Sequence, residues 1–297
     1  MTNSTPLLTT EDLEQLQLQT LERGKPSRHV VASPLAGQQP SVFRGRGMEL
    51  EDVRAYQTGD DVRRMDWRAT ARSGKPIMKV FREERSKELF LVIDRGPGMH
   101  FGTRGELKAA RAARVAALLA FSALAAREPV AGIVVDNREQ FFPPARHLEG
   151  VLALLLAACA PLPESPSTIA VETLLEQIDR TAERGSLICL ISDFAQWREE
   201  HLPLLLHLTA RHKVLALRIV DPGEEELPDA GKIRVVLPAT GTMCVVDTSD
   251  AALRTRYAKA MAERAAALEG LFRYAGIALR PVHTHRDVLQ EMDSLDF

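Results

Sequence analysis

Short apolar runs alternate with longer amphipathic stretches from residue 75 to the end of the chain. The apolar runs have the length of strands, and the stretches between them have the spacing and length of helices. Strands are expected at residues 77–81, 89–94, 130–136, 139–142, 186–194, 213–221 and 277–282, with a hairpin-like pair at 234–238 and 243–247. Helices are expected at residues 106–127, 147–158, 170–183, 199–211 and 250–275, and at the C-terminus. This repetition with short connections predicts an α/β fold with a doubly wound, mostly parallel sheet.

The N-terminal segment before this repetition shows one expected helix followed by a stretch without helix or strand periodicity. A helix is expected at residues 10–23, because Thr9 and Asp12 resemble a capping box at its start and Gly24 and Pro26 end it. Residues 24–47 are rich in Gly, Pro, Ser and Arg, a composition that is typical of an extended arm. We therefore expect three parts: an N-terminal helix and arm at 1–40, a segment at 41–88 packed on the main domain, and an α/β domain at 89–297.

Two aspartates follow apolar runs of the expected sheet. Asp94 ends the run LFLVID, and Asp193 follows the run LICLIS. The second run is part of a continuous apolar stretch at residues 186–194, as expected of a central parallel strand that is covered on both faces. Ligands of doubly wound sheets bind beside the carboxyl ends of the strands. Both aspartates are therefore candidate site residues at one edge of the sheet.

The most distinctive pattern of the chain lies at residues 45–85. An Arg-x-Tyr stretch leads into Gly-Asp-Asp-x-Arg-x-Met-Asp-Trp, and a Thr-Ala-Arg sequence and a basic strand follow. This order and spacing resemble the signature of the family known as domain of unknown function 58, and the resemblance covers residues 40–285. The matching residues are Arg54, Tyr56, Gly59, Asp60, Asp61, Arg63, Asp66, Trp67, Thr70, Ala71, Arg72, Lys79 and Glu84.

The resemblance implies a von Willebrand factor A (Rossmann-like) domain and makes a MoxR-type AAA+ ATPase the leading candidate partner. Domains of that type hold Mg²⁺ with an Asp-x-Ser-x-Ser motif, a threonine from a second loop and an aspartate from a third. The matching residues in this chain are Asp94, Thr168 and Asp193, with Ser167 as a less favoured alternative to Thr168, but Gly96 and Gly98 replace the two serines. Since Mg²⁺ requires near-octahedral oxygen ligands, this loss favours a degenerate site without tight Mg²⁺ binding.

Three interpretations of the degenerate site stay open. The two aspartates can cap loops or accept bonds from backbone N–H groups. Alternatively, Arg95 can replace the cation, or the glycine amides can form an anion nest. In the third interpretation, which we adopt, the degenerate site still marks the binding face. We accordingly expect Arg95, Gly96 and Gly98 to lie on a partner-binding face.

Carboxylates and arginines are interleaved around Trp67 in the signature segment. Paired carboxylates can act as acid and base only if one pKa is raised, whereas carboxylates among arginines are usually ion-paired. We therefore expect a structural latch in which Arg–Asp pairs tie the segment to the sheet, with Trp67 packed beneath. The expected members of the latch are Arg54, Asp60, Asp61, Arg63, Asp66, Trp67 and Arg72.

Charge and composition narrow the possible functions. The net charge is −2, so nucleic-acid binding is not expected. Lys108, Arg111 and Arg114 form a ridge that indicates either a basic surface for an acidic partner or a solvated face. The cysteines are far apart in apolar settings, which is typical of buried thiols in a reducing compartment. Without a signal-peptide pattern or an apolar stretch longer than residues 151–162, a cytoplasmic protein with no direct membrane insertion is expected.

Sequence motifs of common enzyme classes are absent from the chain. It contains no P-loop, no dinucleotide-binding glycine pattern and no nucleophile elbow. We therefore expect a non-enzymatic protein-interaction module with a degenerate metal site, acting as adaptor or substrate of a MoxR-type AAA+ ATPase. The alternative is a metal-dependent hydrolase that uses Asp94 and Asp193.

Overall fold

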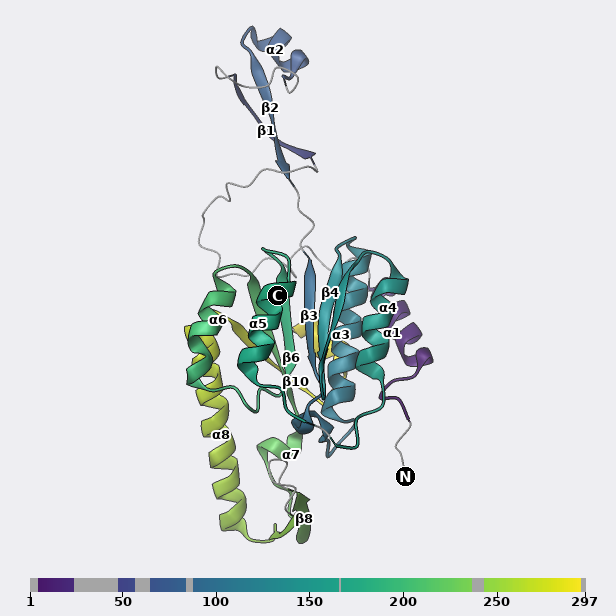
Figure 1. Ribbon diagram of the computed structural model, residues 1–297, viewed down its shortest axis with the longest axis vertical. Helices are drawn as coiled ribbons and strands as arrows, with labels where there is room; N and C mark the ends of the chain where they lie inside the picture. The colour runs from purple at the N-terminus through teal and green to yellow at the C-terminus, as the bar shows by residue number, and fades with distance from the viewer. Residues whose placement is uncertain are drawn as a thin grey trace. The chain divides into compact units, whose positions relative to one another are not determined.

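The computed structural model describes residues 5–23, 48–56, 65–83, 88–165, 167–236 and 243–294 of the chain. The chain divides into two units, Met1–Ser33 with Lys87–Phe297, and Pro34–Ser86. Figure 1 shows that the larger unit is a central sheet with helices on both faces, which confirms the predicted α/β class. The expected packing of residues 41–88 on the main domain stays a prediction.

The sheet of the larger unit has six strands. In chain order they are β3 (Leu89–Asp94), β4 (Val130–Val135), β5 (Glu139–Ala145), β6 (Leu187–Ser192), β7 (Lys213–Val220) and β10 (Ala278–His283). Their spatial order is β10-β7-β6-β3-β4-β5, and within this sheet only β5 runs antiparallel to its neighbour. The mostly parallel sheet and the central, buried position of β6 were both predicted and are confirmed.

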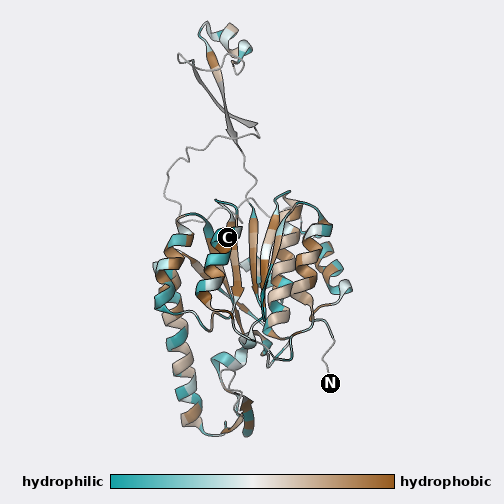
Figure 2. Ribbon diagram, viewed as in Figure 1, coloured by the Kyte–Doolittle hydropathy of each residue, from teal (hydrophilic) through white to brown (hydrophobic). Residues whose placement is uncertain are grey.

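Helices cover both faces of this sheet. One face packs against α3 (Lys108–Ala125) and α4 (Leu148–Cys159). The other packs against α5 (Val171–Thr181), α6 (Leu202–Thr209) and the C-terminal part of α8 (Ala251–Tyr274). Figure 2 shows the apolar residues concentrated in the strands, where both faces are covered.

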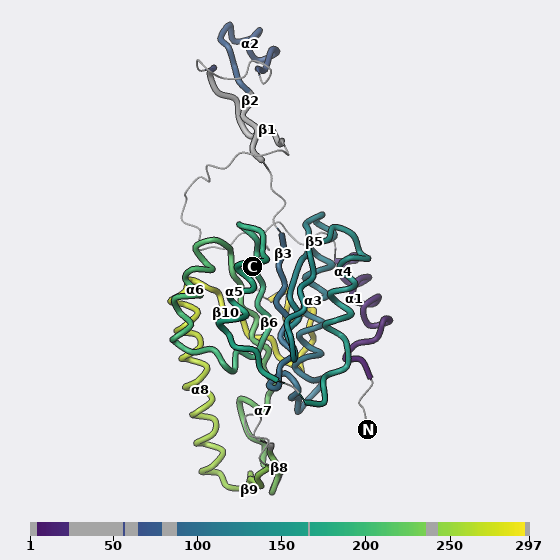
Figure 3. Tube along the Cα trace, in the orientation of Figure 1, coloured from purple at the N-terminus to yellow at the C-terminus, as the bar shows by residue number. Residues whose placement is uncertain are grey.

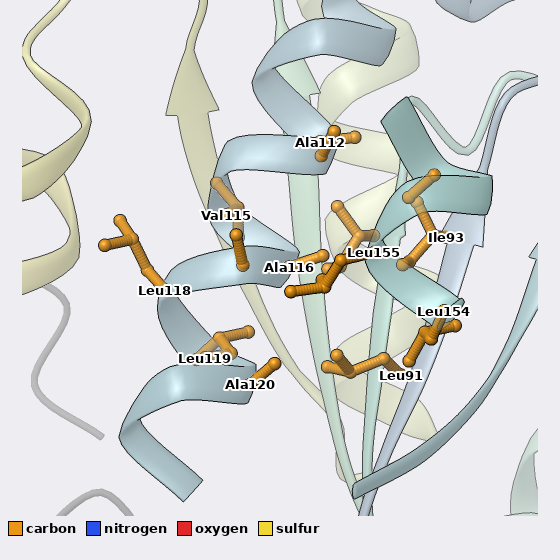
Figure 4. Packing of buried hydrophobic residues seen from close by; sticks show 14 of the residues in the cluster. Leu91, Ile93, Ala112, Val115, Ala116, Leu118, Leu119, Ala120, Leu154 and Leu155 are labelled. Atoms are coloured by element: carbon orange, nitrogen blue, oxygen red, sulfur yellow. The ribbon is translucent and has the colours of Figure 1, made fainter. Parts of the chain in front are cut away.

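Small side chains on α3 allow it to lie close to the sheet. Figure 4 shows Ala112 and Ala116 of α3 beside Ile93 of β3 and Leu155 of α4, and all four side chains are fully buried. The helix expected at 106–127 is confirmed, and its second half is buried because it is apolar nearly all round.

The N-terminal helix α1 (Thr10–Glu22) packs on α3. The predicted capping box is present: Oγ1 of Thr9 accepts from the backbone N–H of Asp12 at 3.1 Å, and the Asp12 carboxylate accepts from the backbone N–H of Thr9 at 2.8 Å. At its other end, Arg23 forms an ion pair of 2.9 Å with Asp293 of α9 (Val288–Ser294). The N-terminal helix thus belongs to the larger unit.

A second set of elements follows β7. It comprises α7 (Pro222–Glu225) and the antiparallel pair β8 (Lys232–Val236) and β9 (Met243–Asp247), which confirms the predicted hairpin strands. Figure 3 shows α7, β8 and β9 in the part of the chain that precedes α8. The Tyr257 hydroxyl of α8 donates to the carbonyl of Gly223 in α7 at 3.0 Å. Across the described ranges, no helix combines the length and the apolar character needed to cross a membrane.

The smaller unit contains an antiparallel hairpin and a short helix. The hairpin pairs β1 (Met48–Ala55) with β2 (Ile77–Glu83), and the helix is α2 (Trp67–Ser73). The strand β2 was predicted, whereas β1 and α2 were not. The Asp66 carboxylate caps α2 by accepting from the backbone N–H groups of Arg68 and Ala69, both at 3.0 Å.

The expected latch stays a prediction, because it joins the smaller unit to the larger one. Within the smaller unit, Trp67 is the first residue of α2 and follows the Asp66 cap, and its side chain is 66% exposed. The side chain of Arg72 is also exposed, and its Nε donates to the carbonyl of Arg68 at 3.4 Å. The remaining expected members, namely the side chain of Arg54 and residues Asp60, Asp61 and Arg63, lie outside the described residues, as does the expected arm at 24–47.

Candidate functional site

The loops after β3 and β6 diverge at the carboxyl edge of the large sheet. These two strands are neighbours, but β3 leads to β4 on one side and β6 leads to β7 on the other. Such a reversal of strand order leaves a crevice in which doubly wound proteins bind ligands. Here it holds a cleft of about 60 Å³. Asp94, Thr168 and Asp193 all line the cleft, so the structure brings together the three residues that the sequence singled out.

Asp94 is the last residue of β3, and both of its carboxylate oxygens accept hydrogen bonds. The backbone N–H of Gly96 donates to Oδ1 at 2.7 Å, and the Ser192 hydroxyl donates to Oδ2 at 2.5 Å. Burial, and after it the negative charge of Asp193, raises the pKa of Asp94 to about 6 against the opposing effect of these bonds. Sequence reasoning missed Ser192, although its position at the end of β6 was an available signal.

Asp193 is held by an ammonium group that sequence reasoning did not connect with it. Nζ of Lys108, the first residue of α3, donates to Oδ2 of Asp193 at 2.9 Å and to Oε1 of Glu224 in α7 at 2.5 Å. The other Asp193 oxygen, Oδ1, accepts from the backbone N–H of Ala195 at 2.8 Å. Lys108 is fully buried, and only 9% of the Asp193 side chain is exposed. The carboxylate is therefore paired and largely withdrawn from water.

The basic ridge on α3 is not a surface, which corrects the expectation for that helix. Besides the buried Lys108, Arg111 is only 5% exposed and donates to the carbonyl of Thr284 at 2.7 Å. Arg114 is partly buried and forms an ion pair of 2.8 Å with Glu106. The three side chains lie against other parts of the larger unit and contact carboxylates and carbonyls of this chain, although Nη1 of Arg111 is buried without a hydrogen-bond partner.

Two glycines leave room for the aspartates. A Cβ atom at position 98 would lie 2.1 Å from Oδ2 of Asp193, and a Cβ at position 96 would lie 3.0 Å from Oδ1 of Asp94. Real Cβ contacts are never as short as the first of these distances, so the Asp193 carboxylate occupies the space that a side chain at 98 would need. Gly96 and Gly98 do line the cleft, as expected of the binding face.

Arg95 does not lie on the binding face, which corrects both roles that the sequence suggested for it. Its side chain is 1% exposed and points to the C-terminal end of α4. Its guanidinium donates to the carbonyls of Ala157, Ala160 and Pro161, the last two at 2.7 and 2.8 Å, and lies 3.7 Å from the Asp136 carboxylate. The carbonyls at a helix C-terminus have no partner within the helix, so this arginine satisfies them. It is neither a surface contact nor a replacement cation in the cleft.

Thr168 lies in the loop before α5, on the rim of the cleft. Its side chain is exposed. The preceding residue fixes the loop: the backbone N–H of Ser167 donates to Oδ1 of Asn137 at 2.7 Å. This contact joins the loop before α5 to the turn between β4 and β5. Thr168 is thus the candidate residue most accessible to a partner.

The residues of the cleft do not fit a bound Mg²⁺ ion. Such an ion needs about six oxygen ligands in near-octahedral positions. Positions 96 and 98 supply no side-chain oxygen, and Oδ2 of Asp193 already contacts the Lys108 ammonium. Within the part of the chain that the structure describes, no group of three or more His, Cys, Asp and Glu side chains is placed to hold a metal ion.

The side chains of His283, Cys159 and Cys189 are engaged in an ion pair or buried in the core, and they do not form a reactive site. Nδ1 of His283 lies 2.7 Å from the Glu291 carboxylate, and the backbone N–H of His283 donates to the same carboxylate. The sequence predicted three buried cysteines; Cys159 and Cys189 are buried, whereas Cys244 in β9 is only partly buried, which corrects the prediction for it. Burial raises the pKa of the Cys159 thiol to about 11. A thiol that stays protonated is a poor nucleophile, so neither buried cysteine has the surroundings of a catalytic residue.

Comparison with known proteins identifies relatives over most of the chain. The family model described as "Protein of unknown function DUF58" matches residues 52–267. The chain is 30% identical over 260 residues to "Uncharacterized protein Rv1480" of Mycobacterium tuberculosis and to "Uncharacterized protein Mb1516" of Mycobacterium bovis, an alignment that covers 87% of this chain and 81% of each relative. Among solved structures, the conserved hypothetical protein BatB from Bacteroides thetaiotaomicron is similar over 71% of this chain and 96% of that chain, with 15% identity and a TM-score of 0.45.

Proposed function

Because this chain belongs to the family described as "Protein of unknown function DUF58", whose description assigns no activity, we propose its function from the geometry of the cleft. The protein is a non-enzymatic interaction module of the von Willebrand factor A type, and it binds a protein partner at the carboxyl edge of its sheet. The leading candidate partner is a MoxR-type AAA+ ATPase, which the resemblance implies, with this chain as its adaptor or substrate.

The size of the cleft is the observation that carries this proposal. Pockets for small-molecule substrates usually have volumes of about 300–1,000 Å³. This cleft has about 60 Å³, which is enough for the tip of one side chain. A protein surface that inserts a single side chain and contacts the rim around Thr168 fits these dimensions, whereas a substrate molecule does not.

A metal-dependent hydrolase using Asp94 and Asp193 is the alternative. One observation favours it: burial and the charge of Asp193 raise the pKa of Asp94 to about 6, and a carboxyl with a raised pKa can act as a general acid. The contacts of Asp193 argue against it, because Lys108 and the backbone N–H of Ala195 engage both of its oxygens. To act as a base or metal ligand, Asp193 would have to use an oxygen that already makes one of these contacts.

Substitution of Thr168 by arginine tests the proposed binding face. The purified full-length protein would be assayed for binding to each purified MoxR-type ATPase of its source organism by biolayer interferometry. Thr168→Arg should weaken binding by at least about tenfold, because a long side chain on the rim blocks the cleft. The matched control is Thr181→Arg, which places the same substitution at the opposite end of α5. Equal weakening by both variants would show that the interface does not lie at the cleft. If the protein bound none of these ATPases, a MoxR-type ATPase would be ruled out as its partner.

An activity screen separates the two candidate functions. The wild-type protein would be incubated with a panel of phosphoesters in the presence of Mg²⁺ or Mn²⁺. The interaction module predicts no turnover. Turnover that Asp94→Asn abolishes would replace the proposal with the hydrolase, because Asp94 is the carboxylate whose pKa suits that chemistry.

A further inference from the structure

Lys108 occupies a position at which its positive charge is unfavourable. It is the first residue of α3, whose N-cap residue Leu107 makes no side-chain hydrogen bond. The N-terminal end of a helix carries a partial positive charge, so a cation in the first turn is repelled. Burial adds a desolvation cost, because the Lys108 side chain is only 1% exposed. The fold therefore keeps an ammonium here only because nearby negative groups offset both costs.

The Asp193 and Glu224 carboxylates supply that compensation from two different loops. Asp193 follows β6, Glu224 lies in α7 after β7, and Lys108 begins the helix that follows β3. Figure 1 shows α7 beside the carboxyl edge of the sheet. The distance of 2.9 Å to Asp193 is that of a charge-assisted hydrogen bond, and the 2.5 Å contact with Glu224 is shorter still. One ammonium thus ties together three connections at the carboxyl edge of the sheet.

The position of Asp193 excludes a side chain at residue 98. A Cβ there would lie 2.1 Å from the same Oδ2 atom that the ammonium contacts. These three groups therefore depend on one another. Gly98 has no side chain, the Asp193 carboxylate occupies the space that a side chain at 98 would need, and the Lys108 ammonium neutralises Asp193. A metal ligand at position 98 cannot coexist with this arrangement.

We propose that the Lys108 ammonium, placed beside the cleft, is the cation that neutralises Asp193 and organises the binding face in place of a divalent metal ion. This tethered charge links Asp193, one of the candidate metal ligands, to Glu224, and no chelator removes it. This inference goes beyond the proposed function, because it holds whether or not a protein partner binds at the cleft.

The wild-type protein provides the first test. Its thermal unfolding would be followed by circular dichroism with EDTA, with Mg²⁺ and with Mn²⁺, and Mn²⁺ binding would be measured from the electron paramagnetic resonance signal of the free ion. The expected result is the same Tm in all three buffers and no bound Mn²⁺. A rise in Tm with Mn²⁺ that Asp193→Asn abolishes would overturn the proposal.

The Lys108→Met variant provides the second test. It keeps the length of the side chain but leaves the two carboxylates without their cation, so its Tm in EDTA should fall well below that of the wild type. Its affinity for Mn²⁺ should rise by at least about tenfold over the wild type, because two carboxylates then face an unneutralised space. The matched control is Lys259→Met on α8, where the lysine side chain is 78% exposed, and its Tm should not change.

A double variant covers the case in which Lys108→Met does not fold. Lys108→Met combined with Asp193→Asn removes one unpaired carboxylate together with the ammonium, so it should be more stable than Lys108→Met alone. A Lys108→Met protein as stable as the wild type in EDTA would overturn the proposal, and so would a double variant that is less stable than the single one.

Discussion

Replacement of Asp94 by asparagine removes an ionisable carboxyl from the cleft while keeping the shape of the side chain. The pKa of this carboxyl is raised from 3.8 to about 6, first because burial withdraws it from water and second because Asp193 carries a like charge nearby. The asparagine amide can donate to the Ser192 oxygen, and its carbonyl can accept from the backbone N–H of Gly96. The substitution therefore isolates the ionisation of Asp94 from the geometry of its contacts.

The direction of the effect follows from the protons that each state binds. Between pH 4 and pH 6 the folded protein keeps the Asp94 proton, whereas the unfolded chain has lost it. The contribution of Asp94 therefore lowers the free energy of unfolding as pH rises through this interval. Each pKa unit corresponds to about 1.4 kcal/mol, so a shift of about two units corresponds to about 3 kcal/mol. Asp94→Asn should match the wild type near pH 4 and should be more stable by up to about 3 kcal/mol at pH 7.

Urea unfolding at a series of pH values measures this difference. The free energy of unfolding would be obtained from circular dichroism for the wild type and for Asp94→Asn between about pH 4 and pH 8. Asp293→Asn, at a side chain that is 66% exposed, controls for the removal of a surface carboxylate. A difference between Asp94→Asn and the wild type that stays constant with pH would refute the reasoning, as would a variant that is less stable than the wild type at pH 7.

Three other substitutions test the packing around the cleft, again by urea unfolding. Gly98→Ser should cost about 1–3 kcal/mol, because its Cβ would lie 2.1 Å from Oδ2 of Asp193. Gly270→Ala is its control: no atom lies within 4 Å of the added Cβ in α8, so it should stabilise by about 0.5–1 kcal/mol, and a loss there would contradict the steric argument. Arg95→Met should cost about 3–5 kcal/mol, because it leaves buried carbonyls and the Asp136 carboxylate without their donor; a cost below about 1 kcal/mol would show that these contacts are weak. Leu155→Ala, at a fully buried position, should cost about 2–5 kcal/mol, and a neutral result would contradict the tight packing of α4 on the sheet.

Local patterns in the sequence were sufficient to predict the secondary structure of the larger unit. Alternating apolar runs and amphipathic stretches predicted its strands and main helices. Burial of a strand or of one helix face sets the spacing of apolar residues, and this spacing is visible within each segment by itself. The same logic placed Asp94 and Asp193 at the carboxyl edge, whereas Thr168 came from the family resemblance; all three residues line the cleft. It did not find β1 and α2 in the signature segment, where charged residues obscure the apolar period.

The roles of the charged side chains were decided by the tertiary structure. Arg95 follows Asp94 directly, yet its guanidinium satisfies carbonyls 62 to 66 residues further along the chain. Lys108 looked like part of a basic surface, but its partners Asp193 and Glu224 are 85 and 116 residues away. Charge along the chain has no period that shows which side chain will be buried or with which carboxylate it will pair. Only the folding of distant loops to one edge of the sheet brings the Lys108 ammonium to Glu224 and to Asp193, one of the candidate metal ligands.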